Sequence, residues 1–478
     1  MSFRMAVLSV AVVGAVAAQG NGFSAGFGRA DITPALGTPI PGYYGKRLVT
    51  GVLDPLEASA VAFSSGGKTA VVVAMDTIST DKAATRAIAD AVKAATGLPP
   101  ESLFLHSSHT HTGGSTRYAV NPACGVTEAE LPAIKAYVKL LSARVADAVK
   151  AALADMAPAE IACGRATLER HAFIRRYLMK DGSTCTNPGV NNPEVDSPVG
   201  SPDNVLQVVR FKRAAPRKEI TVVNFQNHPD VIGGSKVSAD WPGFARRAVE
   251  NAVESTYCVF INGAQGDTNH IVWKPRPGER MQDIYDPRNE GRNYKNSRNM
   301  GLMVAGAALA AWGRCEPVAA GEVKYAITDV RVPSNRPKRE EMELARRYYA
   351  AHAAGRSEEI PAKGMAYVAL VAGAARKLRL ENGPDHFDLP VSAVAIGRSI
   401  VFAGFPGEPF TEIGVKVKEN SPFKMTVIAC CTNGSNGYFP VESAFDEGGY
   451  EASASSFTAA VAPSLVKGQT EQLQLLFR

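Results

Sequence analysis

The sequence has little of what marks a nucleic-acid-binding protein or an integral membrane protein. Its 478 residues include 52 Lys and Arg against 46 Asp and Glu, and the basic side chains are scattered rather than gathered into one stripe. A mixed, solvated surface explains this distribution, so we expect no nucleic-acid partner. After residue 18, no apolar run is long enough to cross a bilayer. The composition, 45% hydrophobic and 21% charged, is instead typical of a globular protein.

Cysteine is too sparse and too irregularly spaced to predict a thiolate metal site. The seven cysteines show no C-x-x-C spacing, and an odd number leaves at least one thiol without a partner in the chain. Cys258, Cys430 and Cys431 lie in apolar, strand-like runs and are expected to be small core residues. The disulfide pattern is left open.

The N-terminus has the pattern of an export signal. Arg4 precedes the apolar run Met5–Ala18, which contains the small residues Ala15-Val16-Ala17. This pattern predicts a signal peptide over residues 1–18, and hence a periplasmic or secreted protein. A buried N-terminal helix or strand is the alternative. No linker rich in Ser, Gly or Pro divides the remainder, so residues 22–478 are predicted to form one domain.

Three stretches of the chain share one plan: a hairpin, a polar loop, a helix, a strand and a second polar loop. Apolar and β-branched runs around turn residues predict the hairpins, and Ala-rich periodicity predicts the helices. The expected strands and helices are 58–63, 70–74, 82–95 and 102–106; 205–211, 220–225, 242–253 and 257–261; and 391–396, 399–403, 409–418 and 425–429. We therefore predict an α/β fold of mixed sheets flanked by helices and built from repeated hairpin–helix–strand units. A chance recurrence of this pattern is the alternative.

Two segments between the units are different in character. Residues 338–380 are rich in Glu, Ala, Arg and Lys and are predicted to be a helical insertion. Residues 177–203 are rich in Asn, Pro, Ser and Gly and are predicted to be a long functional loop.

Reactive side chains follow the strand ends of all three units. Asp76, His228 and Glu408 follow the hairpins, whereas His109, Asp267 and Tyr438 follow the later strands. Loops beyond strand ends are the usual place for a site, so these side chains are expected to converge. Taken singly, each has a structural explanation, such as a loop histidine, a helix N-terminal carboxylate or a turn aspartate.

The combination of histidine and carboxylate indicates a metal site. His109 and His111 alternate along an extended segment, so both imidazoles can face one ion, or one can bind while the other meets the substrate. Nitrogen and oxygen ligands suit Zn2+, although manganese and iron accept overlapping sets. Zinc lowers the pKa of bound water to about 7, which would favour hydrolysis.

The run of motifs resembles the neutral, non-lysosomal ceramidase family, in the family's order and across nearly the whole mature chain. The motifs that carry this resemblance are Gly28–Pro34, Ser108–Gly113, Phe173–Arg176, Asn227–Pro229, Asp240–Gly243, Gly263–Asp267, Gly407–Pro409 and Gly449–Ala452. Each is weak alone, and together they are specific.

The resemblance implies roles for particular residues. His109, His228, Glu408 and Tyr438 match zinc ligands, while His111, Arg175 and Tyr450 match positions that contact the scissile amide or support catalysis. We add Asp267 as a candidate partner of a metal-bound histidine. The implied function is zinc-dependent hydrolysis of an N-acyl amide such as N-acylsphingosine. A lipid-like substrate would also bring peripheral contact with a membrane.

Two departures from the family pattern leave the substrate open. Gly263 stands where we place a family serine, and the chain ends at Arg478 without the immunoglobulin-like domain of longer members. We therefore expect the branch that consists of the catalytic domain alone. The rival functions are a zinc amidase or esterase on a different small or glycan-derived substrate, and a non-catalytic, metal-containing binding protein.

Overall fold

The computed structural model describes residues 22–277 and 290–478, so the predicted signal peptide lies outside the described residues. Three copies of one unit build most of this region: three antiparallel strands, a helix, a strand that returns parallel to the third, and a second helix. The first unit comprises β1 (Ser24–Asp31), β3 (Glu57–Ser65), β4 (Lys68–Met75), α1 (Lys82–Thr96), β5 (Leu103–Ser107) and α2 (Leu131–Ala154).

The other two units repeat this order and these strand directions. The second comprises β6 (Ala157–Thr167), β11 (Val205–Arg213), β12 (Glu219–Phe225), α3 (Asp240–Ala252), β14 (Thr256–Asn262) and α4 (Glu290–Trp312). The third comprises β17 (Val323–Pro333), β18 (His386–Ile396), β19 (Ile400–Gly404), α7 (Thr411–Asn420), β21 (Met425–Ala429) and α10 (Val461–Phe477). The predicted repeat is confirmed, and each copy carries one more leading strand than the sequence indicated.

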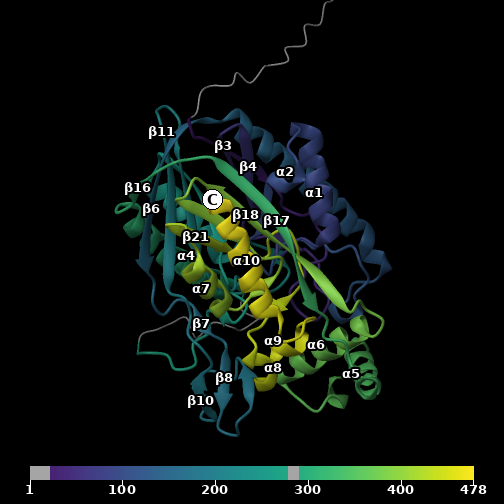
Figure 1. Cartoon of the computed structure of the whole chain (residues 1–478). Coiled ribbons are helices and arrows are strands. Elements are labelled where there is room, and N and C mark those ends of the chain that lie inside the picture. Colours follow the sequence, from purple (N-terminus) through teal and green to yellow (C-terminus); the bar gives the residue numbers. More distant parts are fainter. Residues whose placement is uncertain (1–21, 278–289) are drawn as a thin grey trace, which may run out of the picture.

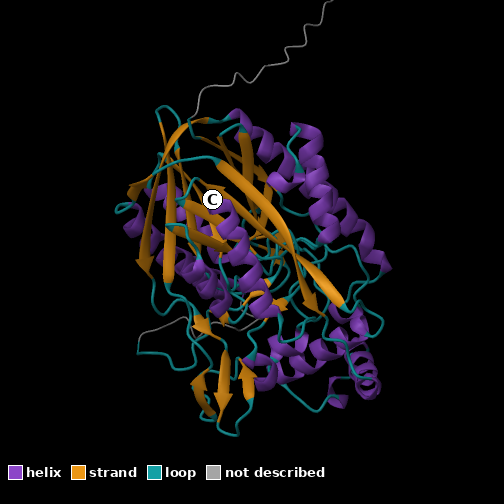
Figure 2. Ribbon diagram, viewed as in Figure 1, coloured by secondary structure: helices purple, strands orange, loops and turns teal. Residues whose placement is uncertain are grey.

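The units assemble into two main sheets. The first two share a nine-stranded sheet in the order β14-β12-β11-β6-β1-β3-β4-β5, with β16 (Glu316–Val318) on β6, and the third forms the four-stranded sheet β17-β18-β19-β21. The strands lie inside and the helices outside, with α1 and α2 on one flank and α10 across the front (Figures 1 and 2).

The inner faces of the strands from all three units meet in one apolar core. Phe63, Phe211 and Phe402 come from the first, second and third units, and the Phe63 ring centroid lies 4.8 Å from that of Phe211 and 5.9 Å from that of Phe402. Three separate clusters on the outer faces pack against the helices of the respective units. Strands covered on both faces read as continuous apolar runs, which is why β4 and β12 were easy to predict.

Smaller elements surround the ends of these strands. They are β2 (Gly51–Val52), β7 (Phe173–Ile174), β8 (Arg176–Met179), β9 (Thr184–Thr186), β10 (Val195–Pro198), β13 (Lys236–Val237), β15 (Thr268–Asn269), β20 (Glu408–Pro409), β22 (Tyr438–Phe439), α8 (Ser443–Glu447) and α9 (Tyr450–Ala454). Residues 177–203 were predicted to be a loop, which is wrong in part: β8, β9 and β10 form a three-stranded sheet there.

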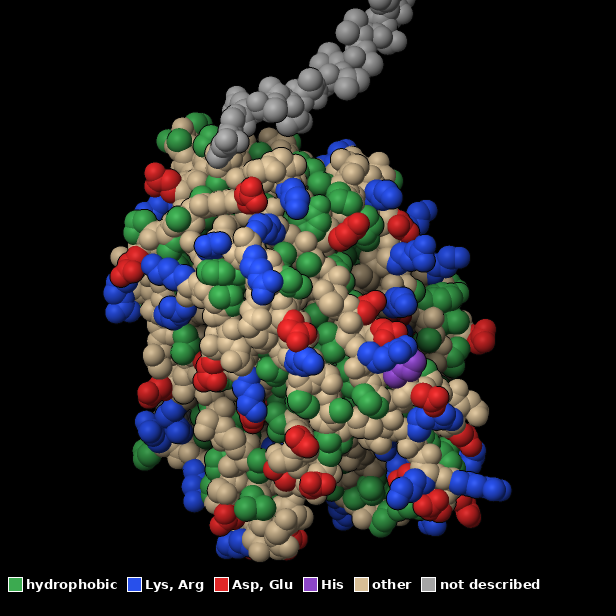
Figure 3. Space-filling model, in the orientation of Figure 1, with side chains coloured by type: hydrophobic (Ala, Val, Ile, Leu, Met, Phe, Trp, Pro, Cys, Tyr) green, Lys and Arg blue, Asp and Glu red, His purple; other side chains and the backbone are tan. Residues whose placement is uncertain are grey.

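The stretch predicted to be a helical insertion contains α5 (Met342–Ala353) and α6 (Gly364–Leu380). These helices lie beside α9 at the lower right of Figure 1. No helix among the described residues has the length and apolar composition to cross a bilayer. On the face shown in Figure 3, Lys and Arg are interspersed with Asp and Glu.

Candidate metal centre

Loops from all three units meet at the carboxyl ends of the strands. Buried asparagines tie these loops together, because Asn262 Nδ2 donates to the carbonyls of Ser108 and Asn227 at 3.0 Å each. Asn433 from the third unit likewise accepts from Leu105 N and donates to Leu103 O in the first. Hydrogen bonds between buried partners fix the loops without water, so the side chains that they carry have defined positions.

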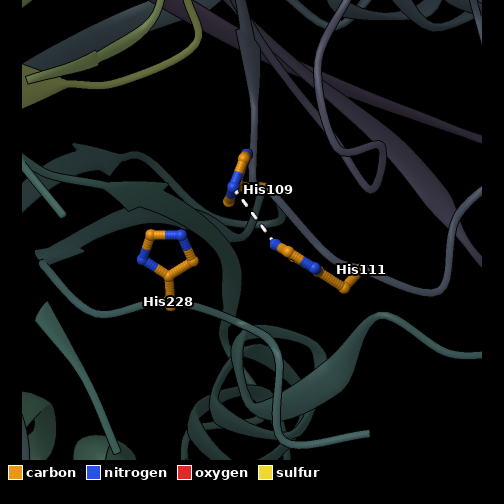
Figure 4. A group of neighbouring side chains, drawn as sticks. All are labelled: His109, His111 and His228. Carbon is orange, nitrogen blue, oxygen red and sulfur yellow. Dashed lines mark hydrogen bonds between the residues drawn. The ribbon is translucent and has the colours of Figure 1, made fainter. Parts of the chain in front are cut away.

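Three buried imidazoles converge at this junction. His109, His111 and His228 each offer a ring nitrogen, and these atoms lie within 4.8 Å of one another. Figure 4 shows the three rings directed toward a common point, with His109 Nε2 3.3 Å from His111 Nε2. The sequence prediction that the His109 and His228 loops meet is therefore correct in geometry.

Glu408 from the third unit joins the same cluster. Its Oε2 lies 3.2 Å from His109 Nε2 and 3.3 Å from His228 Nε2. Gln265 Nε2 lies 3.4 Å from the same oxygen. Each of the three units thus contributes at least one ligand-type atom to one point.

The tautomers of two histidines follow from their other nitrogens. His109 Nδ1 lies 2.8 Å from Ile78 O, and His228 Nδ1 lies 2.9 Å from both Gln265 O and Thr268 O. A carbonyl only accepts, so each Nδ1 carries the proton and each Nε2 presents a lone pair. Backbone carbonyls that orient ligand imidazoles in this way are typical of metal sites.

The facing lone pairs therefore require a cation. Atoms bound at 2.0–2.1 Å to a tetrahedral ion would lie roughly 3.3 Å apart, which matches the separations around Glu408 Oε2. Without an ion, the protein answers with a proton: burial would lower the pKa of His109, but Glu408 raises it to about 9. His109 also has a φ of 73°, a strained conformation for a residue with a side chain, and such strain is concentrated at functional sites. The residues present fit a zinc-type ion.

Tyr438 lies beside Glu408 because β20 and β22 pair in parallel, with Glu408 opposite Tyr438. It is 8% exposed, and its ring lies under the Arg175 guanidinium at 5.4 Å. Burial and Glu408 raise the pKa of Tyr438, while Arg175 opposes them through its charge and a hydrogen bond. The arrangement places the phenol next to the carboxylate, as the ligand prediction requires.

Arg175 is the buried cation of the site. Its Nη1 lies 3.4 Å from His228 Nε2, its Nη2 donates to Gly266 O at 2.8 Å, and its Nε lies 2.7 Å from the Glu451 carboxylate. Burial alone would lower the pKa of Arg175, but Tyr438 and Glu451 raise it, so the guanidinium stays charged. Glu451 was missed by the sequence analysis, although it lies in the Gly449–Ala452 motif.

His111 and Tyr450 lie around the same cluster. His111 N donates to Pro229 O at 3.1 Å, and its Nδ1 is buried with no hydrogen-bond partner among the described residues. Burial and the charge of His109 lower the pKa of His111, so its ring is neutral. The Tyr450 ring lies 5.5 Å from that of Tyr438, and its hydroxyl hydrogen-bonds Tyr44.

Asp267 serves the backbone of the site. Its Oδ1 accepts from Thr411 N and Thr411 Oγ1, both at 2.8 Å, at the first turn of α7. The His228 imidazole is oriented instead by the carbonyls on either side of this aspartate. Gly263, in the same loop, packs against Gln226, where a Cβ would lie 3.0 Å from the Gln226 Cβ.

A pair of polar residues beside the cluster was also missed. Asp230 Oδ1 accepts from His270 Nδ1 at 3.1 Å. The sequence placed Asp230 in the Asn227–Asp230 turn and treated His270 as ordinary, because residues 40 positions apart give no signal of contact.

Comparison with known proteins identifies the fold. No protein-family profile matches the chain, and no curated protein sequence matches it. Among solved structures, neutral ceramidase from Pseudomonas aeruginosa superposes with a TM-score of 0.69 at 17% identity, over 96% of this chain and 75% of that one. A ceramidase complexed with C2 superposes with a TM-score of 0.68 at 15% identity, over 96% of this chain and 76% of that one. The described chain therefore has the neutral ceramidase fold, which the motif resemblance predicted.

Proposed function

We propose that the protein is a metal-dependent hydrolase of an N-acyl amide, similar in chemistry to the ceramidases whose fold it shares. The observation that carries this proposal is the convergence of His109 Nε2, His228 Nε2 and Glu408 Oε2 with their lone pairs facing one another. A buried set of this kind suits a divalent cation, and two histidines and a glutamate are a ligand set found in zinc hydrolases.

In this proposal His109, His228, Glu408 and Tyr438 hold the ion. Zinc, when bound, supplies Lewis acidity and an activated water at neutral pH. His111 also belongs to the histidine group, but its orphaned Nδ1 makes it the better candidate for moving a proton, because a neutral imidazole both accepts and donates.

The charged residues would act on the carbonyl and on the leaving group. Arg175 is buried and cationic beside His228, so it would stabilise the negative charge that develops on the amide oxygen. Tyr450 keeps its proton, because burial and Tyr438 raise its pKa, and it would donate a second hydrogen bond. Neutral His111 would deliver a proton to the departing amine.

The substrate class in this proposal comes from the ceramidase fold. The first candidates are ceramide-like N-acyl lipids, and an exported protein in peripheral contact with a membrane would meet them. A catalytic role for the site, rather than simple metal storage, is favoured by the buried guanidinium beside the ligand cluster, since storage of a cation has no use for a second positive charge there.

Metal analysis followed by an activity assay tests the proposal. Purified protein should contain about one zinc per chain and hydrolyse short- or long-chain N-acyl amines. A strong chelator should abolish the hydrolysis and zinc should restore it. Metal-free protein with undiminished amide hydrolysis would contradict the metal role, and a fully loaded protein that cleaves no amide or ester would leave the binding-protein alternative.

A further inference from the structure

Asp230 and His270 form a buried acid–imidazole pair that the proposed reaction does not use. The His270 side chain is fully buried, and its Nδ1 donates to Asp230 Oδ1 at 3.1 Å. The other ring nitrogen has no partner among the described residues. An imidazole taken out of water for one hydrogen bond has a positioning role, so His270 orients the Asp230 carboxylate.

The carboxylate lies at the metal cluster. Asp230 follows His228 by two residues, and the intervening Pro229 accepts a hydrogen bond from His111 N. Its own carbonyl accepts from the Tyr43 hydroxyl at 3.4 Å. Both sides of the Asp230 backbone are therefore fixed.

Asp230 is ionised and partly open. Burial would raise its pKa, but the hydrogen bond from His270 and the nearby His228 and His111 lower it. The side chain keeps 16% of its exposure, unlike His270. An ionised carboxylate only accepts hydrogen bonds, so the group that it meets in a substrate must be a donor.

The site therefore has two charged sides with different preferences. Arg175 contacts His228 and Tyr438, whereas the Asp230 loop contacts His111. Cleavage of an amide gives a carboxylate, which the guanidinium attracts, and an amine, which a carboxylate attracts. The amine half of a substrate would thus lie toward Asp230.

We propose that Asp230, positioned by His270, determines specificity by binding a hydroxyl or ammonium donor on the amine half of the substrate. The inference rests on the proposed function for the orientation of the substrate, but the donor preference can be measured without turnover. A substrate with a carboxylate on its amine half should be rejected at this position.

Binding of two uncleavable probes to the zinc-loaded protein tests this inference. The probes are the octanesulfonamide of ethanolamine and the octanesulfonamide of glycine, which differ only in a terminal hydroxyl or carboxylate. Calorimetry should show the ethanolamine probe binding about tenfold or more tightly, since a charge-assisted hydrogen bond replaces repulsion. Asp230→Asn should reduce this preference about tenfold, and His270→Gln should reduce it by a smaller factor with the zinc content unchanged.

The matched control is the exposed pair His386 and Asp388, whose His386 Nε2 lies 4.0 Å from Asp388 Oδ2 on β18. His386→Gln and Asp388→Asn should leave the preference intact. Equal binding of the two probes by the unmodified protein would overturn the inference, as would an undiminished preference in zinc-loaded Asp230→Asn. If Asp230→Asn does not fold or loses zinc, an unaltered preference in zinc-loaded His270→Gln overturns it. The assay reads binding alone, so failure to hydrolyse any amide would count against the proposed function and not against this subsite.

Discussion

The loops that follow the hairpins of the first unit and of the other two occupy equivalent positions but have different contents. In the first unit this position holds Asp76, which is fully buried and receives Arg246 Nη1 on Oδ1 at 2.7 Å and Nη2 on Oδ2 at 2.8 Å. Glu57 N also donates to Oδ2 at 2.9 Å. All of this carboxylate's demand is met by protein donors.

The second and third units hold His228 and Glu408 at the same position, and their facing atoms are both acceptors. No donor within either loop resolves this contact, whereas the Asp76 loop faces a guanidinium. The difference teaches that topology places a side chain at the junction, while the charge of its neighbour decides whether it stabilises the fold or binds an ion.

The largest expected effect is loss of the metal. His228→Ala and His109→Ala each remove a ligand, so we expect metal content to fall to near zero and amide hydrolysis to fall by at least about a thousandfold. Elemental analysis and initial rates measure both, with His386→Gln as a surface control. Full metal occupancy in both variants would show that the ligand assignment is wrong.

Asp76→Asn should give the opposite result. Removing one partner of a buried ion pair leaves Arg246 uncompensated, which costs about 3–5 kcal/mol of the free energy of unfolding. Urea denaturation measures this loss, and the metal content of the folded fraction should be unchanged. A variant that keeps its stability but loses its metal would erase the distinction between the two kinds of loop.

Arg175→Gln sharpens the comparison from the side of the cation. Arg246 and Arg175 are both buried with a carboxylate, but only Arg175 also reaches a candidate ligand. We expect kcat to fall about 100- to 1000-fold with the metal retained. An effect confined to KM would mean that Arg175 binds the substrate without stabilising the transition state.

Asp267→Asn should have the smallest effect. Burial raises the pKa of Asp267 to about 6, although its bonds from Thr411 oppose this. The folded state then holds a proton that the unfolded state releases above about pH 4, so stability should fall as pH rises from about 4 to 6. Replacement by Asn should flatten this part of the stability profile by on the order of 1 kcal/mol. An unchanged profile in thermal unfolding at several pH values would contradict it.

The repeated fold was predictable because its signals are local. Runs such as Lys68–Met75 and Met425–Ala429 lie between two layers and are apolar throughout, and helix α1 has Asp81 as its N-cap and Gly97 at its C-terminal end. The three-stranded sheet within residues 177–203 was missed because its short strands lack a continuous apolar face.

The site was predictable only in part. The convergence of His109, His228 and Glu408 followed from the repeat, but contacts such as Asp230 with His270 and Arg175 with Glu451 depend on how the loops pack. The sequence also could not separate Asp76 from its counterparts, because the neutralising charge on Arg246 lies 170 residues away.

Anomalous diffraction at the zinc absorption edge from crystals of the zinc-loaded protein tests the central claim most directly. The account predicts one strong peak about 2.0–2.2 Å from His109 Nε2, His228 Nε2 and a Glu408 oxygen. A peak bound to none of these three atoms, or no peak in protein that hydrolyses amides, would contradict it.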